Sequence, residues 1–149
     1  MSKRREKKSI LVVDDDEAIL ATFKGILEKE GYSVDTAKTG GEAIEKSEAH
    51  FYNLALLDIK LPDMDGTKLL TGLHRNVPNM MKVMVTGYPS MENAVESVNL
   101  KADAFLIKPV NPEELLKVVE EKLREQEEAE NMTEEKVTEW IKTRMRKLA

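Results

Sequence analysis

The sequence predicts an α/β fold built on a doubly wound parallel sheet, and three observations support this prediction. Short apolar runs alternate with longer amphipathic segments, which is typical of βα units. Several of the apolar runs are almost uninterrupted, as expected for strands that are covered on both faces. Carboxylates directly follow two of these runs. Because the carboxyl ends of parallel strands meet at one edge of a sheet, these acids are expected to share a site.

The first half of the predicted domain contains two βα units. They comprise the strand Ile10–Val13, the helix Glu17–Glu30, the strand Tyr32–Ala37 and the helix Glu42–Ala49. The first helix is expected to be capped by Asp16 at its start and by Gly31 at its end. The second strand is more polar than the first, which places it near an edge of the sheet.

The second half continues the same alternation. It comprises the strand Leu54–Leu57, the helix Thr67–Arg75, the strand Met81–Val85, the helix Met91–Asn99, the strand Ala104–Ile107 and a helix from Pro112 through Leu123. Pro is favoured at the first position of a helix, which supports the start at Pro112. Five such units predict a five-stranded, flavodoxin-like sheet with strand order 2-1-3-4-5.

The composition changes after Leu123. Residues 124–130 are polar and acidic, as in a solvated helix end. Asn131 and Glu134 resemble a capping box that would start an additional C-terminal amphipathic helix. Its apolar face would consist of Val137, Trp140, Ile141, Met145 and Leu148. We therefore predict a basic arm at 1–8, a domain at 9–125, and an acidic connector with this helix at 126–149.

The bulk composition narrows the classes of function. The chain has 149 residues, of which 41% are hydrophobic, and a net charge of -5. This mild acidity disfavours nucleic acid as a partner but suits a site for divalent cations. The absence of cysteine excludes disulfides and thiolate metal sites. No apolar stretch approaches the roughly 20 residues of a membrane helix or forms a signal-peptide core, so we expect a cytoplasmic protein without a membrane partner.

Polar and charged residues stand at the ends of four predicted strands. They are Asp14, Asp15 and Asp16 after the first strand, Asp58 after the third, Thr86 and Gly87 after the fourth, and Lys108 with Pro109 after the fifth. Carboxylates are ligands that Mg²⁺ prefers, so the acids predict a metal-assisted site around one reactive aspartate, Asp58. The competing interpretation is that the first acids only cap a helix and that Asp58 is a turn residue.

Four pieces of the sequence carry a resemblance to a known family. They are Val12-Val13-Asp14-Asp15, the run from Leu57-Asp58 through Asp65-Gly66, Val85-Thr86-Gly87, and Phe105-Leu106-Ile107-Lys108-Pro109. In their order and spacing they resemble the receiver domains of two-component response regulators, over about residues 8–125. The resemblance implies the fold described above. It also implies Mg²⁺-dependent phosphorylation of Asp58 by a sensor histidine kinase and a conformational switch that controls a downstream protein.

The resemblance also implies a role for each residue of the site. The metal ligands would be Asp14, Asp15, Asp58 and the backbone carbonyl of Lys60. Thr86 and Lys108 would contact the phosphoryl oxygens, and Gly87 would leave room beside them. Phe105 would turn inward on phosphorylation, although a permanently packed Phe105 is the alternative. Tyr88 would shield the acyl phosphate from water.

Other classes of function fit the sequence less well. A haloacid-dehalogenase-type phosphatase would need Thr or Val where Ala18 stands, and a flavin site would need a Thr/Ser/Gly-rich loop after the first strand. No P-loop is present, so ATP is not expected as the direct phosphodonor. A receiver that only binds protein would not need all the acids. We expect a signalling protein rather than an enzyme, either a single-domain regulator or a fragment of a longer one. A homodimer would form through the fourth helix, fifth strand and fifth helix, or through the C-terminal helix.

Overall fold

Within the described residues, five parallel strands pair into one sheet in the order β2-β1-β3-β4-β5, which confirms the predicted topology. The strands are β1 (Ser9–Val13), β2 (Ser33–Ala37), β3 (Leu54–Asp58), β4 (Met81–Thr86) and β5 (Ala104–Ile107). The structure is a computed structural model that describes residues 7–87 and 101–148. The predicted helix Met91–Asn99 and Tyr88 lie outside these residues.

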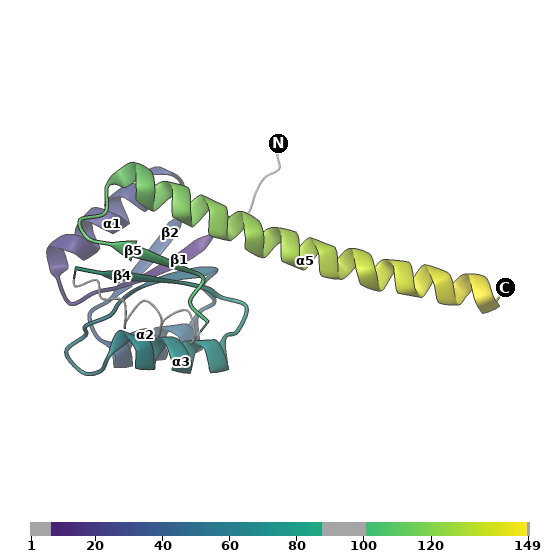
Figure 1. Cartoon of the computed structure of the whole chain (residues 1–149), viewed down its shortest axis with the longest axis horizontal. Coiled ribbons are helices and arrows are strands. Elements are labelled where there is room, and N and C mark those ends of the chain that lie inside the picture. Colours follow the sequence, from purple (N-terminus) through teal and green to yellow (C-terminus); the bar gives the residue numbers. More distant parts are fainter. Residues whose placement is uncertain (1–6, 88–100, 149) are drawn as a thin grey trace.

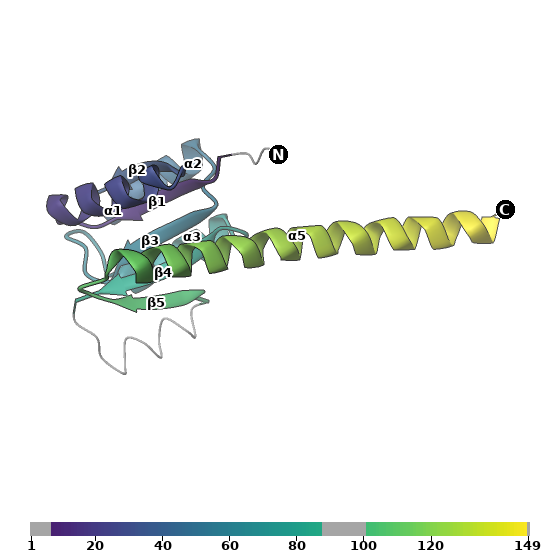
Figure 2. The same cartoon turned by 90° about the horizontal axis from the view of Figure 1, so that it is seen from above.

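The helices lie in two layers, one on each face of the sheet (Figures 1 and 2). They are α1 (Glu17–Lys29), α2 (Gly40–Ala49), α3 (Gly66–Asn76) and α5 (Pro112–Leu148). Helices α1 and α5 cover one face, and α2 and α3 cover the other (Figure 1). The sheet is therefore buried on both sides, which explains why its central strands are almost continuously apolar.

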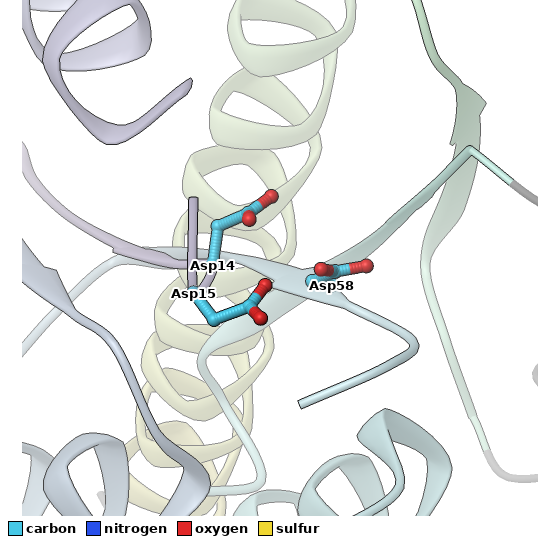
Figure 3. Close-up of side chains that lie close together, drawn as sticks. All are labelled: Asp14, Asp15 and Asp58. Atoms are coloured by element: carbon cyan, nitrogen blue, oxygen red, sulfur yellow. The ribbon is translucent and has the colours of Figure 1, made fainter. Parts of the chain in front are cut away.

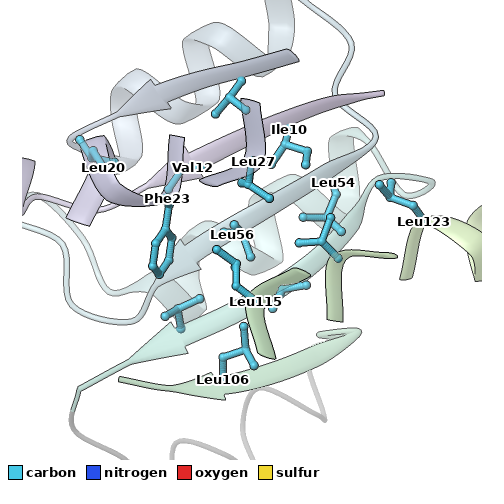
Figure 4. Packing of buried hydrophobic residues seen from close by; sticks show 14 residues of the cluster. Ile10, Val12, Leu20, Phe23, Leu27, Leu54, Leu56, Leu106, Leu115 and Leu123 are labelled. Atoms are coloured by element: carbon cyan, nitrogen blue, oxygen red, sulfur yellow. The ribbon is translucent and has the colours of Figure 1, made fainter. Parts of the chain in front are cut away.

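Alternating side chains of each strand feed two separate cores. On β1, Ile10 and Val12 pack toward Phe23, while Leu11 and Val13 belong to the core on the opposite face. Figure 4 shows the first of these cores, in which Leu115 and Leu106 close the side formed by α5 and β5. Because the side-chain period of a strand is two residues, this alternation fixes the register of the sheet.

Side chains and backbone at the helix ends explain where two helices begin and end. Asp16 accepts hydrogen bonds from the backbone N–H groups of Ala18 (2.9 Å) and Ile19 (3.4 Å), which confirms it as the N-cap of α1. Helix α1 ends one residue earlier than predicted, and Gly31 follows the C-cap with a φ of 99°. Helix α2 begins two residues earlier than predicted, at Gly40, because Thr39 caps it.

Helix α5 corrects the prediction for the C-terminal region. It runs without a break from Pro112 to Leu148, so Asn131 does not start a second helix and the amphipathic segment is the end of α5. The intervening residues are mostly good helix formers without Gly or Pro, and these propensities outweigh the weak capping signal. No helix in the described ranges is both long enough and apolar enough to cross a membrane.

Gln126 also differs from the prediction of a solvated helix end at 124–130. Its side chain is only 6% exposed, and its amide donates to the backbone carbonyls of Asn53 (2.9 Å) and Asn79 (2.8 Å). The side chain of Asn53 donates back to Gln126 at 3.3 Å. These bonds attach α5 to the segments that precede β3 and β4, at the edge of the sheet opposite Asp58.

A second buried polar side chain lies near that edge. Lys82 is 1% exposed, and its ammonium group donates to the carbonyls of Val77 and Met80. Burial lowers the pKa of Lys82, against the opposing charge of Asp103. These carbonyl acceptors indicate a structural lysine that joins the end of α3 to β4.

The loop between β3 and α3 is held by close backbone packing and by a side chain. The N–H of Gly66 donates to the carbonyl of Ile59 at 2.5 Å, which closes the loop directly after Asp58. The carboxylate of Asp63 accepts from the N–H groups of Gly40 (2.8 Å) and Gly41 (2.9 Å). Asp63 therefore satisfies two free donors at the start of α2, and these hydrogen bonds lower its pKa.

We predict opposite effects of the same substitution at two positions of α3. A Cβ on Gly66 would overlap the carbonyl oxygen of Asp58 and lie 2.6 Å from the Cα of Ile59, whereas a Cβ on Gly72 would meet nothing within 4 Å. Gly66→Ala should lower the free energy of unfolding by about 1–3 kcal/mol or more. Gly72→Ala should raise it by about 0.5–1 kcal/mol. Urea denaturation measures both, and equal effects would contradict this packing.

The Asp63 contacts predict a pH-dependent contribution to stability. A carboxyl whose pKa is lowered in the folded state stabilises above its unfolded pKa, and this contribution is lost as the pH falls through the folded pKa. The ordinary value for Asp63 is 3.8. Asp63→Asn, which retains one acceptor oxygen, should therefore lower the melting temperature near pH 6. The difference from the unsubstituted protein should shrink as the pH falls below 3.8. A difference that does not change with pH would contradict the role of the charge.

Candidate functional site

Three carboxylates from two neighbouring strands meet at the carboxyl edge of the sheet (Figure 3). Asp14 and Asp15 follow β1, and Asp58 is the last residue of β3. One oxygen from each of the three lies within 4.8 Å of the others. The arrangement follows from the sheet, because β1 and β3 are adjacent parallel strands paired from Ile10–Leu54 to Val13–Leu57.

Backbone contacts hold the two buried acids in place. The N–H of Asp14 donates to the carbonyl of Ala37 at 3.0 Å, which ties it to the end of β2. Asp58 pairs in register with Val85 of β4, and one of its oxygens accepts from the N–H of Lys60 at 3.3 Å. Asp14 and Asp58 are buried, while Asp15 is exposed. The group is therefore rigid at its base and open to solvent on the side of Asp15.

Lys108 brings a positive charge to this group. It follows β5, and its ammonium group lies 2.7 Å from one oxygen of Asp14 and 3.6 Å from one oxygen of Asp58. Its N–H donates to the carbonyl of Thr86 at 2.7 Å, and the peptide bond to Pro109 is cis. Although β5 is not adjacent to β1, the long lysine side chain reaches across the sheet edge to Asp14.

The charges in this group shift the pKa values of Asp58 and Lys108. Burial and the negative charge of Asp14 raise the pKa of Asp58, and Lys108 only partly offsets them. Burial alone would lower the pKa of Lys108, but its hydrogen bond to Asp14 and the charge of Asp58 outweigh that effect and raise it. The described contacts thus bring one cation to three carboxylates. Such a group of hard oxygen ligands with surplus negative charge fits a divalent cation such as Mg²⁺.

Thr86 and Gly87 lie at the neighbouring strand end. Thr86 is the last residue of β4, is buried, and pairs in register with Ile107. A Cβ on Gly87 would lie 3.7 Å from the Cδ of Lys108, so Gly87 packs against the lysine side chain. The structure therefore brings both residues to the edge that holds Asp58, as the sequence predicts.

Phe105 and Lys60 stand where the sequence predicts, but their roles remain predictions. Phe105 is half-buried on β5 and packs against the core on the α2 and α3 face. This position is intermediate between the permanently packed and the switching interpretation. Lys60 directly follows the Asp58 turn, and its N–H contacts Asp58, as described above. Tyr88 lies outside the described residues.

Asp63 is the functional-site neighbour for which the sequence predicted no role. It lies five residues after Asp58, and its carboxylate caps α2 rather than facing the acidic group. A signal was present in Gly40-Gly41, because a helix that starts with two glycines needs an acceptor from elsewhere in the chain. Its partner could not be read from local sequence, since the acceptor is more than twenty positions away.

Comparisons with known proteins agree with this geometry. The response regulator receiver domain family model matches residues 10–120. The alginate biosynthesis transcriptional regulatory protein AlgB of Pseudomonas syringae pv. tomato is 37% identical over 106 residues, which are 71% of this chain and 24% of AlgB. The chain therefore spans about a quarter of the length of that relative.

Solved structures show the same similarity. A response regulator receiver domain protein (CheY-like) from Methanospirillum hungatei JF-1 is 57% identical, with a TM-score of 0.82, and the match covers 83% of this chain and 99% of that one. The beryllofluoride-activated NtrC4 receiver domain, solved as a dimer, is 36% identical, with a TM-score of 0.76, and the match covers 79% of this chain and 98% of that one. Receiver domains of this kind belong to two-component signalling proteins. With its acidic edge and its strand order, this chain belongs to the response regulator receiver domain family.

Proposed function

We propose that this chain is a Mg²⁺-dependent phosphoacceptor that takes a phosphoryl group from a sensor histidine kinase onto Asp58. The observation that supports this most strongly is the position of Asp58 at the end of β3, beside Lys108 and within 4.8 Å of oxygens from Asp14 and Asp15. A lone turn residue would not need this surrounding charge. A carboxylate that accepts an anionic group does need it.

The residues of the chain would divide the work of phosphoryl transfer. An oxygen of Asp58 would form a bond to phosphorus while the P–N bond to the donor histidine breaks, and the freed imidazole would take up a proton. Asp14, Asp15, Asp58 and the carbonyl of Lys60 would hold the Mg²⁺ ion. The ion would supply positive charge that offsets the repulsion between the carboxylate and the phosphoryl oxygens.

Lys108 and Thr86 would stabilise the phosphorylated product. The ammonium group of Lys108 is bonded to Asp14 and close to Asp58, so a small movement would bring it onto a phosphoryl oxygen. The hydroxyl of Thr86 would donate to another oxygen, and Gly87 would keep the space beside it open. Phosphorylation adds about -1.5 to -2 charges at pH 7. Movement of Thr86 toward that charge would then allow Phe105 to change its packing.

The output would be control of a protein partner. AlgB is a transcriptional regulatory protein about four times as long as the segment that matches here, so the same switch serves a larger regulator there. We propose that the phosphorylated domain, at residues 9–125, acts either alone on a partner or within a longer regulator. The nucleic-acid contact itself is not assigned to this acidic chain.

Mass spectrometry tests the proposed phosphoacceptor. Incubation with Mg²⁺ and acetyl phosphate should add the mass of one phosphoryl group, and EDTA should prevent it. Asp58→Asn should abolish the gain, whereas Asp63→Asn, in the adjacent loop, should retain it. Lys108→Ala should slow the reaction about 100-fold, because it removes a charge aimed at the transferring group. Modification of Asp58→Asn at the original rate would refute the assignment of Asp58.

A further inference from the structure

The distal part of α5, defined here as residues 127–146, leaves the body of the domain (Figures 1 and 2). Up to Gln126 the helix packs on the sheet through Leu115, Val119 and Leu123. An ion pair of 3.5 Å between Lys8 and Glu127 follows. Every residue of the distal segment whose side chain is described is exposed.

This exposed segment carries large apolar side chains on one side. Val137 (53% exposed), Trp140 (60%), Ile141 (49%) and Met145 (64%) are solvent-accessible. Val137 and Ile141 continue the stripe that buries Val119 and Leu123 against the sheet, since 18 residues make five full turns of an α-helix. An apolar stripe on an otherwise free helix indicates a partner that covers it.

The charges of the distal helix identify that partner and its direction. From residue 124 to 135 there are six acids and one base, and from 136 to 147 there are five bases and one acid. Two such helices side by side in the same direction would place acid against acid and base against base. In opposite directions, the acidic half of each lies along the basic half of the other. The helix is thus complementary to itself only in the antiparallel arrangement.

The positions of individual charges supply the register. Glu130, Val137 and Arg144 are spaced by seven residues and lie on the same side of the helix, two turns apart. When two antiparallel helices cross at Val137, Glu130 of each lies opposite Arg144 of the other. The guanidinium of Arg144 lies 4.9 Å from the ring centroid of Trp140, so it also covers part of the apolar side.

We propose that the distal part of α5 binds the same segment of a second copy of this chain as an antiparallel helix pair centred on Val137. The apolar stripe is buried between the two helices, and two Glu130–Arg144 contacts flank it. The two domains lie at opposite ends of the pair, because each helix enters it from its own domain. This pairing is independent of phosphorylation and of the site at Asp58.

Sedimentation equilibrium of the full chain tests the pairing. The chain should form a dimer. Ile141→Glu should make it monomeric because a charge then enters the stripe. Met132→Glu is the matched control, since Met132 is 57% exposed but lies on another side of the helix, and it should leave the dimer unchanged. Circular dichroism verifies that both variants keep their helix. A monomeric chain, or a dimer that survives Ile141→Glu, overturns the proposal.

Charge reversal tests the direction of the helices. Glu130→Arg and Arg144→Glu should each weaken the dimer about tenfold, because each sets like charges opposite one another. The double reversal should restore the original affinity. In a parallel pair each single reversal would only replace one like-charge contact by another, and the double reversal would restore nothing. That result would overturn the antiparallel arrangement.

Disulfide trapping gives an independent test, because the chain contains no cysteine. A mixture of the Glu130→Cys and Arg144→Cys variants should give the mixed disulfide under mild oxidation. Glu130→Cys alone should give little dimer. Efficient crosslinking of Glu130→Cys to itself would show a parallel pair and overturn the proposal. The Asp58→Asn variant should dimerise as well as the unsubstituted chain, so failure here and failure of phosphorylation remain distinguishable.

Discussion

The crowding of three carboxylates around Lys108 is the constraint on which the rest of the site depends. Placing buried Asp14 next to buried Asp58 is unfavourable, as the raised pKa of Asp58 shows. The sheet imposes this arrangement, because register pairing brings the ends of β1, β3 and β4 together. The domain therefore holds acids in a position that added positive charge would relieve. The account treats this unsatisfied charge as the source of both metal affinity and reactivity.

The loop after Asp58 connects this constraint to the opposite face of the sheet. Gly66 closes the loop directly against the carbonyl of Asp58, in a space that no side chain can share. Three residues earlier, Asp63 supplies the N-terminal acceptors of α2. One short loop therefore orients the reactive carboxylate and joins two helices. A change near Asp58 can consequently reach the α2 and α3 layer through direct hydrogen bonds.

Local pattern predicted the strands and the site, because both depend on short-range properties. Runs such as Leu54–Leu57 are apolar on both faces, and a polar residue at the end of each run marks the sheet edge where Asp58, Thr86 and Lys108 meet. The errors arose where distant contacts decide. Asn131 looked like a cap, but the propensity of its neighbours continues α5. Gln126 looked solvated within an acidic run, and only the folded chain reveals that it bonds to Asn53 and Asn79.

The central claim is that the crowded carboxylates form one Mg²⁺ site whose ligands come from both β1 and β3. Titration of the unphosphorylated protein with MgCl₂, followed by backbone amide NMR, tests it most directly. The account predicts saturable shifts confined to the ends of β1 and β3 and to the loop after Asp58, with one affinity at all of these positions. Asp15→Asn should weaken that affinity at every position together, while Asp63→Asn should not. Shifts that never saturate, or that occur equally in both variants, would contradict the claim.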